Sequence, residues 1–414
     1  MTMFKPSDVN MDRVKNEINT LSQLGRNESG GITRYTFSDA HIQASQNVAL
    51  WMSEAGLDVS FDPWGNLFGR TTGTMTTKGV LTGSHLDSVP NGGNFDGPLG
   101  VLSSLEAVRL IIEKGITINK PLEVVSFIEE EGARFYGLLG STLATGRMDE
   151  DQIATLKDQD GNRYLDVLSQ IDFGFPIDTD SNLPNRTSHY IELHIEQGKR
   201  LESAGISIGV VTAVAGPNFT KIQLNGRSDH AGATDYEHRY DTLLAAAEIT
   251  LRIREVGMTQ FLGRGHMTVG RVIPHPNVTN VVAGRTEMSI DFRADTDETA
   301  TEMQSAIEAL IQEITTKHRI TYETLSAQSV APAPTPQAIK QAISHSAEQA
   351  DIDSLDLISW AAHDAMVMSN VAESGMIFVP CRDGRSHCPE EFVEDDDISD
   401  GIATLANTLV QLAQ

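Results

Sequence analysis

The chain has 414 residues, which is too long for one compact core and fits two domains, or one domain with a large insertion. Apolar residues make up 40% and charged residues 21%, so the composition is that of a globular protein and excludes a disordered chain. The 31 Lys and Arg residues against 57 Asp and Glu residues give a net charge of −26. A field of this sign repels phosphate backbones and anionic membrane surfaces, so we expect no nucleic-acid partner and no membrane partner.

Cysteine content and the first residues bear on location. The two cysteines, Cys381 and Cys388, are too few for a disulfide framework and lack zinc-finger spacing. Charges stand where a signal peptide would need an apolar core, and no run approaches the ~18 apolar residues of a membrane span. We therefore expect a cytoplasmic protein.

Helical and strand patterns alternate along the chain, which is typical of an α/β protein. Apolar spacing and capping signals predict helices at 41–55, 99–114, 239–256 (closed by Gly257), 299–318 and 336–350. Short β-rich runs predict strands at 80–84, 122–128, 190–194, 219–225, 267–273, 287–293 and 376–380. The acidic run 394–397 is interpreted as a solvated turn.

The middle of the chain has a rhythm of its own. From about residue 212 to 325 the order is strand, helix, strand, strand, helix, strand, which is that of a ferredoxin-like split βαβ unit. A Pro-rich connector, APAPTP at 331–336, follows. We expect an inserted α+β domain at residues 212–326, between two parts of a larger α/β domain at 1–211 and 327–414.

The most informative stretch is GSHLDSVPNGGNFDGPLG at 83–100. A predicted strand ends at Ser84, and His85 and Asp87 follow in an extended spacing that places both side chains on one side. This is the edge where open α/β sheets place their active sites, and Asp87 could accept the second N–H of a ligating His85. Glycines on both sides of Asp96 let backbone crowd a site, which favours a functional loop over a surface turn.

A second stretch, VVSFIEEEGARF at 124–135, is a continuous apolar strand that ends in Glu129, Glu130 and Glu131. Adjacent like charges at a strand end are costly unless a cation offsets them. One carboxylate can ligate a metal ion while its neighbour moves a proton. A charged exit from a strand explains one or two acids better than three.

Two further predicted strands lead to a histidine. IELHIEQG at 191–198 contains His194, and the strand at 376–380 is followed by GRSH, which contains His387. Each alone is more typical of a structural histidine. A mixed nitrogen and oxygen ligand set forms when they are combined with the earlier motifs: His85, Asp96, Glu131, His194 and His387. Such donors suit Zn²⁺, Mn²⁺, Co²⁺ or Ni²⁺ rather than metals that prefer thiolates.

These motifs resemble the amidase branch of the M20 metallopeptidase superfamily, which contains N-carbamoyl-L-amino-acid hydrolases, allantoate amidohydrolases and β-ureidopropionases. GSHLDSVPNGGNFDG, EEGARF, LHIEQG, DHAGAT and GRSH match in order over nearly the whole chain. The resemblance implies a two-metal hydrolase domain with a central mixed sheet, and an inserted ferredoxin-like domain that acts as a lid and dimerisation domain. The peptidase branch has a carboxylate where this chain has His194, so this motif favours the amidases.

The resemblance also implies a role for each ligand. His85 and His194 would hold one divalent ion. Glu131 and His387 would hold the second ion, and Asp96 would bridge the two. We expect Zn²⁺ at both positions, with Mn²⁺, Co²⁺ and Ni²⁺ as alternatives.

Catalytic and substrate contacts follow in the same way. Glu130 falls on the general base of the family, and Asp87 on the partner of His85. His230, in DHAGAT, would reach the active site of the partner subunit in a homodimer and stabilise the oxyanion. The expected substrate contacts are Gln197, His230, Asn280, Arg293 through a bidentate carboxylate contact, and the backbone at Ala362.

The expected substrate is an N-carbamoyl-L-amino acid, cleaved to amino acid, CO2 and ammonia, with allantoate and 3-ureidopropionate as alternatives. The run VAGPNFTK at 214–221 resembles the apolar start of the inserted domain in carbamoylases. Allantoate has a second ureido group, and each of its polar atoms left unpaired on burial would cost ~1–3 kcal/mol. Pro217 has no N–H to offer such a group, although Asn218 has a polar side chain.

The chain departs from the family pattern at two places. TDY at 234–236 stands where members often read Thr-Pro-Met, and WAAHD at 360–364 stands where they read Gly-Ala-Gly-His-Asp. The second change adds bulk beside a backbone contact to substrate, so it bears on substrate identity more than on mechanism.

Three other classes of protein compete with this interpretation. GISIG at 205–209 fits the serine-hydrolase pattern G-x-S-x-G, but a β-branched run follows instead of the helix that a nucleophile elbow requires. A non-catalytic binding protein on this fold would have lost the base or a metal ligand, and the sequence retains all of them. An M20-type aminopeptidase or dipeptidase stays a remote alternative.

Overall fold

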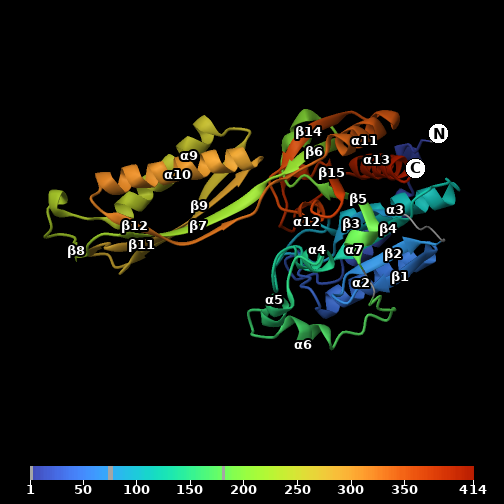
Figure 1. The fold of residues 1–414 in the computed structure, drawn as a ribbon, viewed down its shortest axis with the longest axis horizontal. Helices are drawn as coiled ribbons and strands as arrows, with labels where there is room; N and C mark the ends of the chain where they lie inside the picture. The colour runs from blue at the N-terminus through green and yellow to red at the C-terminus, as the bar shows by residue number, and fades with distance from the viewer. Residues whose placement is uncertain (1–2, 73–77, 180–181) are drawn as a thin grey trace. The chain divides into compact units, whose positions relative to one another are not determined.

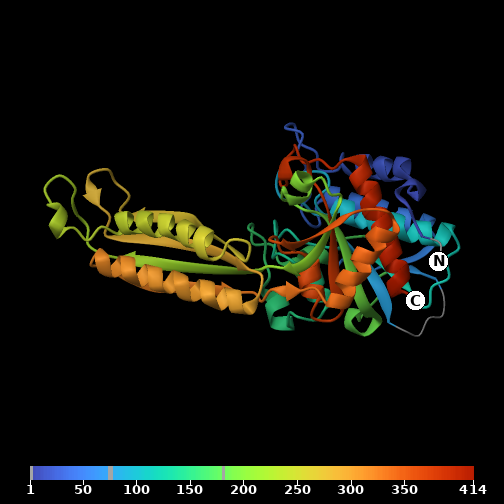
Figure 2. The ribbon, with the colours of Figure 1, turned by 90° about the horizontal axis from the view of Figure 1, so that it is seen from above.

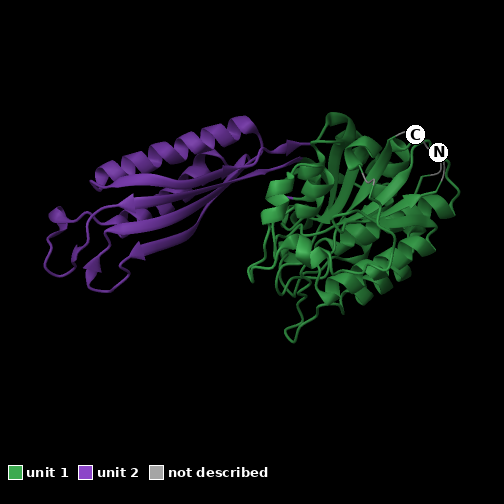
Figure 3. Cartoon of the chain, turned by 60° about the horizontal axis from the view of Figure 1, so that its bottom comes forward, with its two compact units in different colours: residues 1–212, 335–359, 363–414 green, residues 213–334, 360–362 purple. Residues whose placement is uncertain are grey.

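The computed structural model describes residues 3–72, 78–179 and 182–414, and Figure 1 shows its helices and strands. The chain divides into two compact units (Figure 3). The first unit comprises 1–212, 335–359 and 363–414, and the second comprises 213–334 and 360–362. The second unit is therefore an insertion in the chain of the first.

The first unit is built on a mixed sheet. Its strands lie in the order β1, β2, β4, β3, β5, β15, β6, and β14 also pairs with β6. The neighbours β4, β3, β5 and β15 are parallel, and the pairs β1–β2, β2–β4 and β15–β6 are antiparallel. The bounds are β1 (Leu57–Phe61), β2 (Leu67–Thr71), β3 (Gly79–His85), β4 (Leu122–Phe127), β5 (Thr187–Ile195), β6 (Ile208–Val214), β14 (Ser354–Ser359) and β15 (Glu373–Val379). The carboxyl ends of the parallel strands therefore meet at one edge.

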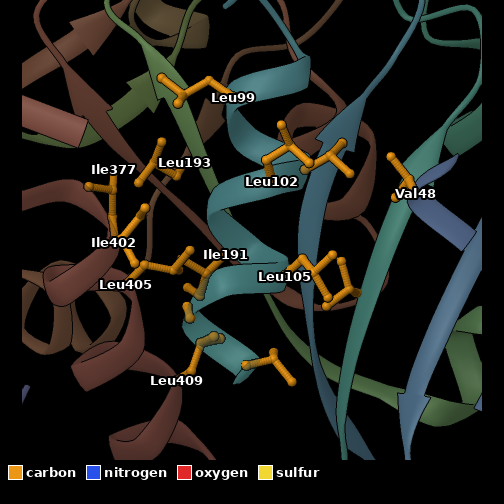
Figure 4. Packing of buried hydrophobic residues seen from close by; sticks show 14 of the residues in the cluster. Val48, Leu99, Leu102, Leu105, Ile191, Leu193, Ile377, Ile402, Leu405 and Leu409 are labelled. Carbon is orange, nitrogen blue, oxygen red and sulfur yellow. The ribbon is translucent and has the colours of Figure 1, made fainter. Parts of the chain in front are cut away.

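Helices cover both faces of this sheet. Their bounds are α1 (Met11–Leu21), α2 (Asp39–Glu54), α3 (Pro98–Glu113), α4 (Leu139–Ala144), α5 (Glu150–Thr155), α6 (Tyr164–Leu168), α7 (Leu183–Arg186), α8 (Arg200–Ala204), α11 (Gln337–Gln349), α12 (Asp364–Met368) and α13 (Asp395–Leu412). In the core, apolar side chains of α3 and α13 pack against β5 and β15 (Figure 4). The contacting residues include Leu99, Leu102, Leu105, Ile191, Leu193, Ile377, Ile402, Leu405 and Leu409.

The opposite face of β5 is polar. Because side chains alternate along a strand, Glu192 and His194 point away from the face that carries Ile191 and Leu193. Glu192 Oε2 accepts a hydrogen bond from the backbone N–H of Ala365 at 3.0 Å. Helix α12 therefore covers the face opposite to α3 and α13.

The second unit is an antiparallel sheet with two helices side by side on one face (Figures 1 and 2). Its strands lie in the order β12, β7, β11, β9, and a short pair, β8 and β10, stands apart. The bounds are β7 (Gly216–Asn225), β8 (Asp229–His230), α9 (Thr242–Gln260), β9 (Gly265–His275), β10 (Val281–Val282), β11 (Arg285–Ala294), α10 (Asp297–Lys317) and β12 (Thr321–Ser329). Ile222 and Leu224 of β7 are buried in a separate core, whereas Phe219 and Lys221 are exposed, so one face of the sheet is open.

The mixed α/β architecture with a central mixed sheet is as predicted, and each predicted strand range overlaps an observed strand. The predicted limits of one helix are wrong. Helix α9 begins at Thr242, where the Asp241 side chain accepts hydrogen bonds from two backbone N–H groups, and it continues through Gly257 to Gln260. A glycine inside a helix costs about 1 kcal/mol relative to alanine, which does not by itself end the helix.

The acidic run at 394–397 is not the solvated turn that the sequence predicts. Glu394 is the N-cap residue of α13, and the three following aspartates form the first turn, where the helix dipole favours negative charge. Asn407 in this helix bonds to the backbone N–H and C=O of Phe4 at 2.9 and 3.0 Å. Tertiary contacts of this kind stabilise a helix whose interior holds weak helix formers.

The structure also bears on the G-x-S-x-G pattern and on membrane-spanning helices. Ser207 lies between α8 and β6, so the order is helix, turn, strand, the reverse of a nucleophile elbow. Across 3–72, 78–179 and 182–414, no helix combines the length and apolar character needed to cross a bilayer.

Candidate active site

The predicted ligands gather where the parallel strands end. His85 is the last residue of β3, and His194 is next to last in β5. Glu131 follows β4 within a few residues, and His387 lies in the loop after β15. Asp96 lies in the loop that leads into α3. Because β4, β3, β5 and β15 are neighbours, the topology brings the five side chains together.

Asp96 lies between two groups of ligand atoms. Its Oδ1 is 3.7 Å from His85 Nε2 and 3.3 Å from His194 Nε2. Its Oδ2 is 3.2 Å from His387 Nε2, which in turn is 3.6 Å from Glu131 Oε2. Within each group, one ligand atom from every residue lies within 4.8 Å of the others. The arrangement offers two cation positions that share one carboxylate.

The protonation of the two buried histidines fits metal ligation. His85 Nδ1 lies 3.1 Å from the Asp87 carbonyl oxygen, and His194 Nδ1 lies 3.0 Å from the Ile195 carbonyl oxygen. A carbonyl oxygen can only accept, so Nδ1 of each ring carries a proton, and Nε2, on the side of Asp96, is the atom available to a metal ion.

Unpartnered buried atoms provide a second test of the fit. Nε2 of His85, Nε2 of His194 and Oε1 of Glu131 are buried and have no hydrogen-bond partner among the described residues. Leaving a buried acceptor unpaired costs free energy, and a divalent cation would give each of these atoms a partner. The residues present therefore fit a pair of divalent cations.

Buried carboxylates give the site a strongly negative character. Burial opposes ionisation of Asp96, but the interactions of its carboxylate with the neighbouring His194 and His387 rings outweigh burial and hold the pKa of that carboxyl well below its usual range. Burial, followed by repulsion from Glu131, raises the pKa of Glu130 well above its usual range. Burial, followed by repulsion from Asp96, raises the pKa of Glu131 to about 8. Such crowding of acids is relieved by a cation.

Asp87 makes a different contact from the one predicted. The Nδ1–H of His85 donates to the backbone carbonyl oxygen of Asp87, and the nearer carboxylate oxygen of Asp87 is 3.7 Å from His85 Nδ1. The two carboxylate oxygens instead accept the backbone N–H groups of Glu130 and Glu131, each at 3.2 Å. Asp87 therefore holds the turn that presents these two glutamates.

Glu130 faces the same cluster. Its Oε2 lies 3.7 Å from His85 Nε2, and its Oε1 lies 3.9 Å from His363 Nδ1. Gln197 donates a hydrogen bond from Nε2 to Asp96 Oδ2 at 2.7 Å, and its buried Oε1 has no partner among the described residues. Both side chains lie next to the predicted metal ligands.

The other predicted contacts lie in the second unit. His230 Nδ1 accepts hydrogen bonds from the backbone N–H groups of Gly232 and Ala233, both at 3.1 Å. The proton of a neutral His230 is therefore on Nε2, which makes Nε2 a donor. Asn280 is adjacent, because its carbonyl accepts the N–H of Ala231 at 2.9 Å.

Arg293 is held by its own unit. Its Nη1 donates to the carbonyl oxygen of Trp360 at 2.6 Å, and its Nη2 is 3.3 Å from Asp291 Oδ2. Ala362 belongs to the same short segment, 360–362. The structure thus brings together the predicted residues of the first unit around Asp96. In the second unit, His230 lies next to Asn280, and Arg293 contacts the 360–362 segment.

Sequence reasoning missed a buried polar layer behind the histidines. Glu192 accepts a hydrogen bond from Ser84 Oγ at 2.8 Å, and the His363 ring lies 4.5 Å from the His194 ring, between centroids. Asp364 accepts a hydrogen bond from Ser141 Oγ at 2.6 Å. Glu192 and His194 are two residues apart in β5, so their side chains lie on the same face of the strand. This spacing is the feature of the sequence that could have placed Glu192 near the site.

The chain belongs to peptidase family M20/M25/M40, whose sequence profile matches residues 81–411. It is 37% identical over 410 residues to an N-carbamoyl-L-amino acid amidohydrolase of Geobacillus stearothermophilus, with 97% of this chain and 98% of that protein covered. It is 34% identical over 408 residues to an allantoate amidohydrolase of Bacillus subtilis (strain 168), with 97% and 98% covered. The solved structure of an amidase of the hydantoinase/carbamoylase family from Burkholderia multivorans matches with a TM-score of 0.91 at 32% identity, covering 98% of each chain. The chain is a hydrolase of the amidohydrolase type, which acts on C–N bonds other than peptide bonds.

Proposed function

We propose that this amidohydrolase cleaves the carbamoyl amide of an N-carbamoyl-L-amino acid to give the amino acid, CO2 and ammonia. The observation that carries the proposal is the Asp96 cluster, in which two groups of ligand atoms share one carboxylate next to Glu130. The names of the relatives support a carbamoyl or ureido substrate.

The side chain of Asn218 favours the carbamoyl substrate over allantoate. Its Nδ2 donates to the Gly216 carbonyl at 2.9 Å, and its Oδ1 accepts from Ser329 Oγ at 2.5 Å. Asn218 is 4% exposed, and Pro217 beside it has no N–H. Neither residue then offers a free polar group to the second ureido group of allantoate.

Two divalent cations, with Zn²⁺ as the first choice, would be held as the ligand geometry indicates. His85 and His194 would serve one, Glu131 and His387 the other, and Asp96 both. When bound, such cations polarise a carbonyl oxygen and lower the pKa of a water molecule from its bulk value towards ~7.

Proton transfer falls to Glu130. Its carboxylate takes a proton from the water that attacks the carbamoyl carbon and returns it to the leaving nitrogen. Asp87 keeps Glu130 in place through the backbone N–H bond, which leaves both carboxylate oxygens of Glu130 free for this exchange.

Substrate binding and charge stabilisation fall to the second unit. The Nε2–H of His230 donates to the oxygen that becomes negative, as its tautomer allows. Arg293 and Asn280 hold the substrate carboxylate, and the backbone at Ala362 and the amide of Gln197 complete the contacts. We further propose a homodimer formed through the second unit, in which His230 serves the site of the partner subunit.

The test compares kcat/KM of the Zn²⁺-loaded enzyme for N-carbamoyl-L-methionine, allantoate and 3-ureidopropionate, with a dipeptide as the control for peptidase activity. We expect at least a tenfold preference for N-carbamoyl-L-methionine and no release of amino acid from the dipeptide. A tenfold preference for allantoate or for 3-ureidopropionate would overturn the substrate assignment.

A further inference from the structure

A buried carboxylate outside the ligand set, Glu391, contacts the loop that carries Asp96. Glu391 is 5% exposed. Its Oε1 accepts hydrogen bonds from the backbone N–H of Phe95 at 2.7 Å and of Asp96 at 3.0 Å. Two N–H groups bonded to one carboxylate oxygen fix the backbone from which the Asp96 side chain projects.

The other oxygen of this carboxylate reaches the loop that carries His387. Ser386 Oγ lies 3.0 Å from Glu391 Oε2 and 2.6 Å from Asp96 Oδ2. Ser386 directly precedes His387 in the chain. Its hydroxyl therefore lies between the carboxylates of Glu391 and Asp96, and can donate its single proton to either of them.

Gly93 gives Glu391 the room it needs. A Cβ atom at position 93 would lie 2.1 Å from Glu391 Oε1 and 2.2 Å from Glu391 Cδ. These separations are far below van der Waals contact, so any side chain at position 93 would displace the carboxylate. Position 93 of the NGGNFDG motif therefore requires glycine for the Glu391 carboxylate to pack where it does.

The contacts of Glu391 are not those of a structural salt bridge. Among residues that the structure describes, no lysine or arginine forms an ion pair with it. The other side of Glu391 borders a cavity of about 540 Å³, which is also lined by Ile18, Phe95 and Phe392. Removing the carboxylate would leave space rather than a neighbour able to replace its hydrogen bonds.

We propose that Glu391 is a positioning residue for the metal centre. It holds the Asp96 loop and the His387 loop together, so that the two oxygens of Asp96 face different ligand groups. The inference rests on the proposed two-metal site, but it concerns how that site is assembled and not which substrate is cleaved. Loss of a residue that orients a metal ligand weakens metal affinity by about 10- to 100-fold.

The experiment titrates metal-free protein with Zn²⁺ in competition with a chromophoric chelator, and records the thermal midpoint of the protein with and without Zn²⁺. We expect Glu391→Ala to bind at least one of the two Zn²⁺ ions at least tenfold more weakly than the unaltered protein. Gly93→Ala should have the same effect, because it displaces the carboxylate without removing it. The lost hydrogen bonds cost stability with or without metal, so the thermal midpoint of both variants should fall somewhat in the metal-free form and clearly more in the Zn²⁺-loaded form.

Two further variants separate position from charge. Glu391→Gln keeps an oxygen for the two N–H groups and an amide that Ser386 Oγ can accept from, so its Zn²⁺ affinity should stay within about threefold. Glu390→Ala removes the neighbouring exposed carboxylate, which pairs with Arg385 at 3.0 Å, and should change nothing.

Four results would overturn the inference. The first is unchanged Zn²⁺ affinity in Glu391→Ala and Gly93→Ala, and the second is a loss in Glu391→Gln as large as in Glu391→Ala. The third is a fall in the midpoint of the metal-free variants as large as that of the metal-loaded ones, which would mark a purely structural role. If Glu391→Ala does not fold, Gly93→Ala and Glu391→Gln decide. Failure of the unaltered protein to bind two Zn²⁺ ions is the fourth result, and it would overturn the proposed metal site as well.

Discussion

The three consecutive glutamates after β4 have three different sets of contacts. Glu129 accepts hydrogen bonds from the backbone N–H of Arg134 at 2.6 Å and of Phe135 at 2.5 Å, which closes the following loop. Glu129 itself has a positive φ of 55°, a strained conformation for a residue with a side chain. This kink directs Glu130 towards His85 and Glu131 towards the other ligand group. One residue of the three therefore builds the loop and two face the site.

The contacts predict separate phenotypes for the three isosteric variants. Glu130→Gln should retain two Zn²⁺ ions but lose at least ~100-fold in kcat, because the amide cannot take up a proton. Glu131→Gln should lose metal, and Glu129→Gln should remain active, since an amide oxygen can still accept the two N–H bonds. Steady-state kinetics and metal content by mass spectrometry check these outcomes. Near-normal turnover in Glu130→Gln would remove it as the general base.

His41 makes stability sensitive to acid. Burial, followed by the charges of Arg34 and His85, lowers the pKa of His41 from 6.5 to about 3, and neither ring nitrogen has a partner among the described residues. The unfolded chain therefore binds a proton at His41 below pH 6.5 that the folded chain does not bind until about pH 3. Stability from this residue is complete above pH 6.5 and falls as the pH drops towards 3.

The corresponding measurement compares urea unfolding of the unaltered protein and His41→Leu, both metal-free, between pH 7.5 and 5. Subtracting the two curves cancels the acid-sensitive groups that the proteins share. By pH 5 the unaltered protein should have lost about 2 kcal/mol more than the variant, which is an upper bound because water can enter. Parallel curves would show that His41 does not contribute.

At the scale of elements, the loop that carries His230 is held by arginine side chains. Arg239 donates to the carbonyls of Ala231 at 2.6 Å and Thr234 at 3.0 Å, and Arg227 donates to the carbonyl of His238 at 3.0 Å. The guanidinium groups of Arg227 and Arg319 also lie against the Tyr240 ring, each with its Cζ atom 4.9 Å from the ring centre. This segment contains only the two-residue strand β8 and one turn of 3-10 helix at Tyr236–His238, so it depends on these bonds for its order.

Arg239→Ala should lower kcat roughly tenfold, since loosening the loop frees the bonds that set the His230 tautomer, while Zn²⁺ binding should stay unchanged. Arg252→Ala is the matched control, because Arg252 pairs with exposed glutamates on the helices of the same unit. A fall in metal affinity instead of kcat would contradict a role restricted to His230. Limited proteolysis at 231–240 offers an independent measure of loop order.

At the scale of the whole molecule, the residues proposed for one reaction are divided between two units with separate cores. The metal ligands and Glu130 belong to the first unit, and His230, Asn280 and Arg293 belong to the second. This division makes a composite site in a homodimer testable with two inactive variants.

Mixing His230→Ala subunits with Glu130→Gln subunits should restore activity. In a hybrid dimer, the site with intact Glu130 receives intact His230 from the partner, whereas the other site has both defects. Half of the dimers are hybrids after random exchange at equal amounts, so about a quarter of full activity should return. Exchange is verified by native mass spectrometry of differently tagged subunits. No recovery after verified exchange would mean that His230 acts within its own subunit or not at all.

Local patterns in the sequence were sufficient to predict the four parallel strands of the first unit, the α/β alternation and the residues at those strand ends, whereas β1, β2, β6 and β14 were not predicted. A strand end such as Ser84-His85 or the three glutamates after β4 is a local feature, because a strand that is buried along its whole length stops where the polar residues begin. Helix limits were less accurate, since Gly257 lies inside α9 and tertiary packing allows it to remain helical.

Only the tertiary structure decided which polar group each side chain meets. Asp87 was expected to contact His85 through its carboxylate, yet the carboxylate binds the N–H groups of Glu130 and Glu131 from a different strand end. Glu391 contacts a loop almost three hundred residues away, at a sequence separation of 296 for Phe95. Sequence periodicity reports which face of an element is buried, whereas hydrogen bonds between distant segments depend on how the strands are ordered in the sheet, and a single chain's pattern does not encode that order locally.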